Sequence, residues 1–227
     1  MTNLHPAYLH IRDALPGDVD ALAAIIRYAM PMDPQWDYRF PLRKQYPEDN
    51  YGYTRLMMKS FLEAQGVVVK VVTFPAPGLP EEDEVPAALA VWEVEPDKDK
   101  KYSLTPTGDK TARRDANFEH MAAFGSTTRA ARETYFNSVY QSRQLHLRIL
   151  ATLPEFQRKG AGTALCRWGI ERAKQHQVPV TLLSSPLGHA LYSSLGFTDI
   201  ATVTVQVKEE EEKLSIRVMA YPYEPVY

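Results

Sequence analysis

Residues 145–162 read LHLRILATLPEFQRKGAG, and this stretch carries most of what the sequence says about the fold. Apolar and polar residues alternate over 145–149, which predicts a strand over 145–152, and a helical pattern runs from Gly160 to about Gln175. Glycines between them let the backbone approach a ligand, and free N–H groups at a helix start face an anion. Since Arg158 and Lys159 add positive charge, the loop predicts a diphosphate site. The alternative is a helix start whose glycines only relieve crowding.

Two well-known phosphate loops do not match this stretch. A P-loop requires Lys and then Ser or Thr directly after its last glycine, whereas Thr163 and Ala164 follow Gly162 here. A dinucleotide fingerprint requires a third glycine or alanine where Leu165 stands. It also requires an acidic residue at the end of the next strand, where residues 182–185 read LLSS. Both loop types are therefore excluded.

The segment from Leu150 to Gly162 resembles the acetyl-CoA motif of the GNAT superfamily of N-acetyltransferases, whose core pattern is Gln/Arg-x-x-Gly-x-Gly/Ala. Residues 190–197, ALYSSLGF, resemble the family helix Ala-x-x-Tyr-x-x-x-Gly-Phe that packs along CoA. The resemblance implies an α/β (α+β) GNAT fold, with a mixed, mostly antiparallel sheet of six to seven strands flanked by helices on both faces. It also implies acetyl-CoA as co-substrate, held by backbone groups of the splayed strand and by the loop amides. Carried onto this chain, the cofactor-binding residues are Leu150, Ala151, Thr152, Gln157, Arg158, Lys159, Gly160, Ala161, Gly162, Thr163 and Ser193.

Direct acetyl transfer needs a neutral amine, a polarised thioester carbonyl and an acid for the departing thiolate. Tyr192 stands at the family's Tyr position, and a phenol with a pKa of about 10 stays protonated and able to donate. We expect His146 to be the general base, because an imidazole with a pKa of about 6.5 can accept a proton from an ammonium. Period-two alternation puts His146 on the same face of its strand as Arg148 and Leu150. Glu93, on a neighbouring strand, is the alternative base.

The strand over 145–152 is also similar to that of the arylalkylamine N-acetyltransferases, which carries two histidines two residues apart. This chain keeps the first as His146 and has Arg148 at the second position. Arginine cannot serve as a base and instead pairs with carboxylates, so we expect Arg148 on the substrate side or in a packed salt bridge. The departure argues against an arylalkylamine as acceptor.

An aromatic segment offers candidates for binding the acceptor. Trp36 and Tyr38, with Phe40, Asp33 and Asp37 nearby, could pack an apolar substrate body and attract an ammonium. A satellite hydrophobic core explains the same residues equally well. We therefore predict Trp36 and Tyr38 as substrate-binding residues and leave the core interpretation open.

The rest of the chain is predicted to form one domain, 1–227, with an insertion at about 95–140. The aromatic stretch over 31–53 is expected to be a loop or broken helix. Further helices are predicted at about 16–29, 54–64, 115–140 and 188–195. Further strands are predicted at 8–12, 67–72, 88–94, 179–184, 202–207 and 214–221.

Composition excludes several classes of protein. The chain has 44% hydrophobic and 24% charged residues, and no apolar run approaches the roughly 18 residues that span a bilayer. A net charge of −2 gives no basic surplus for nucleic acid. Because Cys166 is the single cysteine, it cannot form an intrachain disulfide, and it lacks partners for a metal site. Its position on the same helical face as apolar residues predicts a core thiol. We therefore expect no metal, and direct transfer in a ternary complex without an acyl-cysteine.

The leading hypothesis is an acetyl-CoA-dependent transfer to a primary amine of a small molecule. A protein or peptide acceptor, or an acyl-CoA-binding domain without catalysis, are the alternatives. The N-terminal residues lack the basic and apolar regions of a signal peptide, so a cytoplasmic location is expected. We expect a monomer or homodimer.

Overall fold

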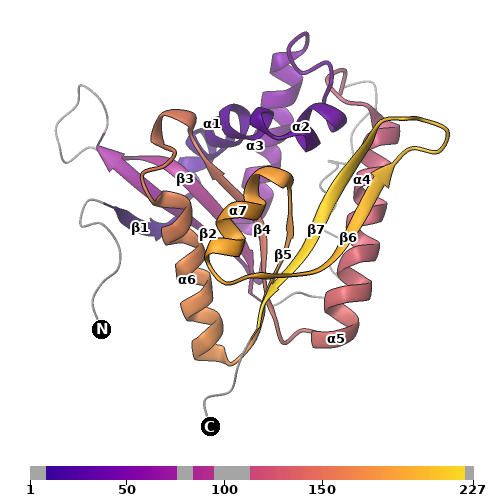
Figure 1. Ribbon diagram of the computed structural model, residues 1–227. Coiled ribbons are helices and arrows are strands. Elements are labelled where there is room, and N and C mark those ends of the chain that lie inside the picture. The colour runs from indigo at the N-terminus through magenta and orange to yellow at the C-terminus, as the bar shows by residue number, and fades with distance from the viewer. Residues whose placement is uncertain (1–8, 76–83, 95–112, 223–227) are drawn as a thin grey trace.

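A single mixed sheet of seven strands organises the computed structural model, which describes residues 9–75, 84–94 and 113–222 (Figure 1). Its strand order is β1-β2-β3-β4-β5-β7-β6. Every neighbouring pair is antiparallel except β4 with β5, which confirms the predicted mixed, mostly antiparallel sheet. The strands are β1 (His10–Asp13), β2 (Val67–Pro75), β3 (Glu84–Glu93), β4 (Leu145–Thr152), β5 (Val180–Ser184), β6 (Thr198–Gln206) and β7 (Lys213–Tyr221).

Helices cover both faces of the sheet (Figure 1). On one face lie α6 (Ala161–His176) and α7 (Pro186–Ser194), and on the other lie α1 (Val19–Ala29), α3 (Pro47–Glu63) and α4 (Phe118–Arg132). The short α2 (Pro34–Arg39) sits near the turn between β6 and β7 (Figure 1). Short helical turns complete the fold: η1 (Pro16–Asp18), η2 (Met30–Met32), the π-helical η4 (Glu133–Asn137), α5 (Ser138–Tyr140) and η5 (Pro154–Phe156).

The aromatic stretch over 31–53 is a broken helix, as expected, and α3 begins inside it. Pro47 occupies the first turn of α3, where its missing N–H has no cost, and Glu48 and Asp49 place negative charge at the helix start. These residues start α3 earlier than the predicted residue 54. Residues 95–112 of the predicted insertion lie outside the described part of the chain, and α4 packs on β6 and β7.

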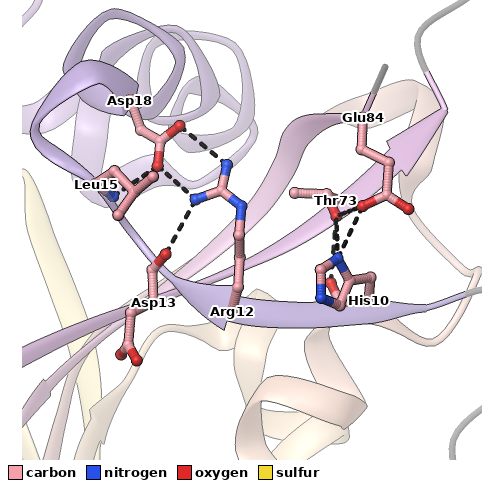
Figure 2. A network of polar contacts seen from close by, with 7 residues as sticks. All are labelled: His10, Arg12, Asp13, Leu15, Asp18, Thr73 and Glu84. Carbon is pink, nitrogen blue, oxygen red and sulfur yellow. Dashed lines mark hydrogen bonds and ion pairs between the residues drawn. The ribbon is translucent and has the colours of Figure 1, made fainter. Parts of the chain in front are cut away.

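Polar contacts fix the edge strand β1 at both ends (Figure 2). The Arg12 guanidinium donates to both carboxylate oxygens of Asp18, at 2.6 and 3.0 Å, and so ties β1 to the start of α1. His10 Nδ1 lies 2.9 Å from Glu84 Oε2, and the Thr73 hydroxyl donates to the same oxygen. These contacts join β1, β2 and β3, and β1 is the edge strand of the sheet formed by the described residues.

Strand β4 contains a β-bulge. In the β3–β4 ladder, Val91 pairs with Ile149. The next residue of β3, Trp92, pairs with Leu147, which leaves Arg148 as an extra residue on β4. An extra residue inverts the alternation of side chains beyond it.

The bulge overturns the expected facing of β4. His146 lies against Phe136, with ring centroids 5.8 Å apart, on the α4 side of the sheet. Leu150 packs in the core cluster on the α6 side, whereas Ile149 packs with α1 and α3. The expectation that His146 and Leu150 share a face is therefore wrong, because strict period-two counting ignores the extra residue Arg148.

The contact between α6 and β3 leaves no space for a side chain at Gly169. A Cβ atom there would lie 2.2 Å from Trp92 Cη2, and the Trp92 side chain is fully buried. We expect Gly169→Ala to lower the free energy of unfolding by about 1 to 3 kcal/mol, since the ring cannot move without disturbing the core. Urea denaturation measures the change.

Gly52→Ala and Gly125→Ala are the matched controls. Both glycines are helical, and an added Cβ meets nothing within 4 Å at either position. Alanine there should stabilise the protein by up to about 1 kcal/mol through its better helix propensity. A neutral or stabilising effect of Gly169→Ala would contradict the packing argument.

Candidate active site

An opening in the sheet between β4 and β5 forms the centre of the site. The two strands pair only where Leu145, His146 and Leu147 lie beside residues 180–182. Beyond this point β4 stays beside β3 as far as Thr152 and has no pairing with β5. Within the described ranges, the backbone of 149–151 therefore has no strand pairing on its β5 side, and the resemblance implies that a ligand would bind there.

The glycine loop closes one end of this opening. Gly160 adopts a φ of 90°, a left-handed conformation that favours glycine, and Arg158 adopts a φ of 62°. The first intrahelical hydrogen bond of α6 runs from Ala164 N to Gly160 O at 2.9 Å. Within the described ranges, the N–H groups of 161–163 have no acceptor. Free N–H groups and the positive end of a helix dipole are the general arrangement that binds anions, and the start of α6 has both.

Several residues predicted to bind the cofactor meet at this loop. A Cβ on Gly162 would lie 3.5 Å from Leu191, 3.8 Å from Leu150 and 4.0 Å from Thr152. The Gln157 side chain donates to the Thr152 carbonyl at 3.1 Å. The two sequence motifs are thus adjacent in space. The remaining predicted cofactor-binding residues differ in their exposure to solvent. Exposed are Arg158, Lys159 and Ser193, half-buried is Thr163, and buried are Ala151 and Ala161.

Tyr192 lies on α7 with its ring against Phe197, 5.8 Å between centroids, and is 8% exposed. Burial raises the pKa of its phenol well above the ordinary value, with smaller effects from Cys166 and Asp33. The hydroxyl is therefore protonated at neutral pH and can donate. Cys166 itself is fully buried, and burial raises the pKa of its thiol to about 12, which agrees with a core thiol.

A buried carboxylate lies beside His146. Glu93 is the ladder partner of His146 and accepts hydrogen bonds from Arg132, on α4, and from Arg148 at 2.5 Å. Burial opposes the charge of Glu93, but His146 in its protonated form and the guanidiniums of Arg132 and Arg148 lower the net pKa of this carboxyl to about 2. Burial and Arg132 lower the pKa of His146 well below its ordinary value. His146 is therefore neutral and Glu93 ionised.

Arg132 and Thr181 are site neighbours that the sequence analysis missed. Arg132 contacts Glu93 across 39 positions of sequence. The Thr181 hydroxyl lies 2.9 Å from His146 Nδ1 and comes from β5. A charged residue on a polar helix face and a threonine in a strand are common, so no local signal distinguishes them.

Trp36 and Tyr38 are buried in the core. Trp36 packs with α1 and α3, and Tyr38, 2% exposed, packs with residues of β6 and β7. In this conformation neither side chain offers a contact surface to a solute. Their role in binding an acceptor stays a prediction.

Tyr38 belongs to a set of contacts that joins α2, α4 and the turn over 207–212, which we call the cover. The His120 ring on α4 stacks on Tyr38, 3.9 Å between centroids, and lies 2.7 Å from the Tyr38 carbonyl. Its Nε2 lies 2.7 Å from Glu210 Oε2 in the turn. At the other end of α2, Met32 contacts Gln157 and Asp33 acts electrostatically on Tyr192. The segment that leads into α2 therefore contacts the glycine loop through Met32 and Gln157.

Both ring nitrogens of His120 face acceptors, a carbonyl and a carboxylate, so this geometry requires the imidazolium. Burial opposes the charge, but the hydrogen bonds to Glu210 and Tyr38 raise the net pKa of His120. Because the pKa of His120 is higher in the folded than in the unfolded state, protonation of this ring stabilises the fold. The stabilisation is complete below the unfolded-state pKa of about 6.5 and is lost as the pH rises through the folded-state pKa. The free energy of unfolding lost in His120→Phe should therefore be largest in mild acid and decline with rising pH.

Denaturation of wild type and variant across this pH range checks the prediction, because phenylalanine keeps the ring stack without the charge. His176→Phe, at an exposed position near the end of α6, is the control. A difference for His120→Phe that grows with pH would contradict the imidazolium assignment.

Three other observations concern metal ions, membranes and a surface groove. Within the described ranges, no group of three or more His, Cys, Asp or Glu side chains is arranged to hold a metal ion. None of the helices in the described part of the chain has the length and apolar character needed to cross a bilayer. A groove of about 240 Å³ lies away from the opening, lined by Ile11, Arg167, Trp168, Glu171, Arg172 and Gln175.

Known proteins resemble this chain in sequence and in fold. A family model described as an acetyltransferase (GNAT) domain matches residues 118–199. A Stachybotrys chartarum protein named acetyltransferase is 25% identical over 223 residues, covering 96% of this chain and 92% of its own length. A Corynebacterium glutamicum structure, described as histone acetyltransferase HPA2 and related acetyltransferase, has a TM-score of 0.58 at 16% identity, covering 96% of this chain and 98% of that chain. The PaiA N-acetyltransferase from Thermoplasma acidophilum, in complex with coenzyme A, has a TM-score of 0.53 at 11% identity, covering 95% and 99%.

Proposed function

Because this chain belongs to the GNAT superfamily of acetyltransferases, we propose that it transfers the acetyl group of acetyl-CoA to a primary amine of a small molecule. The donor side follows from the loop that begins α6. The free amides of 161–163 would hold the pyrophosphate, and the unpaired edge of β4 would hold the pantetheine arm and thioester. Coenzyme A is bound by a structural neighbour of the same fold.

The cover is the observation that favours a small acceptor. Contacts of His120 with Tyr38 and Glu210 join α2, α4 and the β6–β7 turn into a continuous structure beside the opening. An extended peptide would need an open groove there, whereas a small amine needs only a channel. The acceptor is therefore proposed to be small.

In the proposed reaction, the amine nitrogen attacks the thioester carbonyl carbon. A C–N bond forms, the C–S bond breaks, and the departing sulfur takes the phenolic proton of Tyr192. The amine gives up its proton to His146, directly or through water. Both carboxylate oxygens of Glu93 already accept hydrogen bonds from arginines, and its pKa is about 2, so Glu93 is the weaker candidate for the base.

A screen of acceptors tests the proposal. Purified full-length protein would be mixed with acetyl-CoA and with primary amines, amino acids, or peptides bearing a free N-terminus or a lysine, and CoA release followed with a thiol reagent. The buried Cys166 should add little background. Turnover with small amines at lower KM than with peptides supports the proposal. Turnover with peptides alone would refute the small-molecule acceptor and leave the acetyltransferase assignment in place.

A further inference from the structure

A chain of side-chain hydrogen bonds runs from the buried His146 to the protein surface. His146 Nδ1 lies 2.9 Å from Thr181 Oγ1, which lies 2.7 Å from Gln144 Oε1. Gln144 Nε2 donates to the Gln141 carbonyl at 2.9 Å and to Asn137 Oδ1 at 3.2 Å. The three inner members, His146, Thr181 and Gln144, are 3%, 0% and 2% exposed, so water cannot easily replace these contacts.

The outer end of the chain determines the direction of every hydrogen bond. A backbone carbonyl only accepts, so the Gln144 amide must present its NH₂ group to Gln141. Asn137 likewise presents its NH₂ group to the exposed Glu133 carboxylate, at 2.9 Å, and its oxygen to Gln144. Neither amide can be turned over without placing two acceptors, or two donors, against each other. Gln144 Oε1 is therefore the acceptor that faces Thr181.

The same logic then assigns the proton on the imidazole. The Thr181 hydroxyl has one proton, which it donates to Gln144 Oε1. Its oxygen can then only accept from His146, so the neutral ring carries its proton on Nδ1 and its lone pair on Nε2.

Unusual backbone conformations place the outer members of this chain. Residues Glu133–Asn137 form a π-helical turn, a feature that is rare and often found at functional sites. Gln141 has a φ of 55°, which costs energy in a non-glycine residue and persists only where surrounding contacts impose it. The fold thus keeps a strained segment that directs the Gln141 carbonyl and the Asn137 amide toward Gln144.

We propose that Thr181 and Gln144 are positioning residues that hold neutral His146 as the Nδ1–H tautomer and so keep its Nε2 lone pair free to take the proton of the acceptor amine. The inference rests on the proposed function, in which His146 is the base. The tautomer matters because burial keeps this ring neutral at pH 7. When Nε2 takes the amine proton, Nδ1–H stays bonded to Thr181, and the Nε2 proton later leaves to solvent.

Three variants separate positioning from packing. Thr181→Val keeps the shape of the side chain and removes the hydroxyl, while Thr181→Ser keeps the hydroxyl. Gln144→Met removes the acceptor and leaves the Thr181 hydroxyl free to donate to Nδ1, which permits the Nε2–H tautomer. Nitrogen-15 NMR of histidine-labelled protein distinguishes the two tautomers, with the His146 signal assigned from a His146→Gln sample. This readout needs no substrate.

We expect the Nδ1–H tautomer in wild type and Thr181→Ser, and a substantial Nε2–H population in Thr181→Val and Gln144→Met. Turnover should fall roughly 10- to 100-fold in the latter two and recover in Thr181→Ser, since a misdirected base loses alignment with the amine. The Nε2–H tautomer in wild type, or unchanged kcat and pH profile in Thr181→Val, would overturn the proposal. If no acceptor is turned over by wild type, the proposed function fails, and the NMR result still judges the tautomer assignment.

Discussion

Replacing Tyr192 with phenylalanine should lower kcat by roughly 10²- to 10⁴-fold, the usual effect of losing a general acid. The phenol is 8% exposed, and burial raises its pKa well above the ordinary value, so it keeps its proton until the thiolate departs. Phenylalanine preserves the ring contact with Phe197. Binding of CoA, measured as an increase in Tm, should therefore stay close to wild type, while steady-state turnover falls.

Tyr221→Phe is the matched control for this prediction. Tyr221, on β7, also packs its ring on Phe197, with centroids 5.6 Å apart, and its hydroxyl has no part in the proposed reaction. Its turnover should equal that of wild type. Equal losses in the two variants would indicate a packing effect, and unchanged turnover in Tyr192→Phe would remove Tyr192 from the mechanism.

Replacing Glu93 with glutamine should destabilise the protein by about 3 kcal/mol at pH 7, because breaking a buried ion pair leaves uncompensated charge. Glu93 is 2% exposed and pairs with both Arg132 and Arg148. We expect the lower end of the usual range because these two side chains keep 21% and 18% of their exposure and can be partly hydrated. Chemical denaturation measures the loss.

The same variant has a defined pH dependence. The folded-state pKa of Glu93, about 2, is lower than its ordinary value of 4.5, so its stabilisation is present above pH 4.5 and is lost as pH falls toward 2. The difference between wild type and Glu93→Gln should therefore shrink in acid. Glu171→Gln breaks a solvent-exposed pair with Lys174 and should change stability by less than about 1 kcal/mol. A Glu93→Gln effect as small as this control would contradict the role assigned to the buried pair.

Local sequence was sufficient to predict most elements and the position of the glycine loop at the start of α6. The strand over 145–152 was predicted at its observed bounds, and the glycine loop, the start of α6 and the motif around Tyr192 lie together as the resemblance implied. Such features are predictable because their determinants are local. A φ of 90° favours glycine at position 160, and the first amides of any helix have no acceptor within the helix itself.

The acceptor side was less predictable because its geometry depends on contacts between distant segments. The bulge at Arg148 is defined by the pairing with β3, and it places His146 and Leu150 on opposite faces of the sheet. The burial of Tyr38 depends on His120 and on the β6–β7 turn, which no aromatic pattern in 31–53 could reveal.

Sequence thus established the family resemblance, the order of the strands along the chain and the glycine loop before α6, because each depends on neighbours a few residues apart. Only the tertiary structure decided which charges surround His146, which of its nitrogens carries the proton, and what covers the opening. Arg132 approaches Glu93, and Thr181 links His146 to Gln144, only when α4 and β5 pack beside β3 and β4. The strength of these ion pairs and the positions of these protons depend on the buried, low-dielectric surroundings that the packed elements create. The pattern of residues along the sequence does not specify those surroundings.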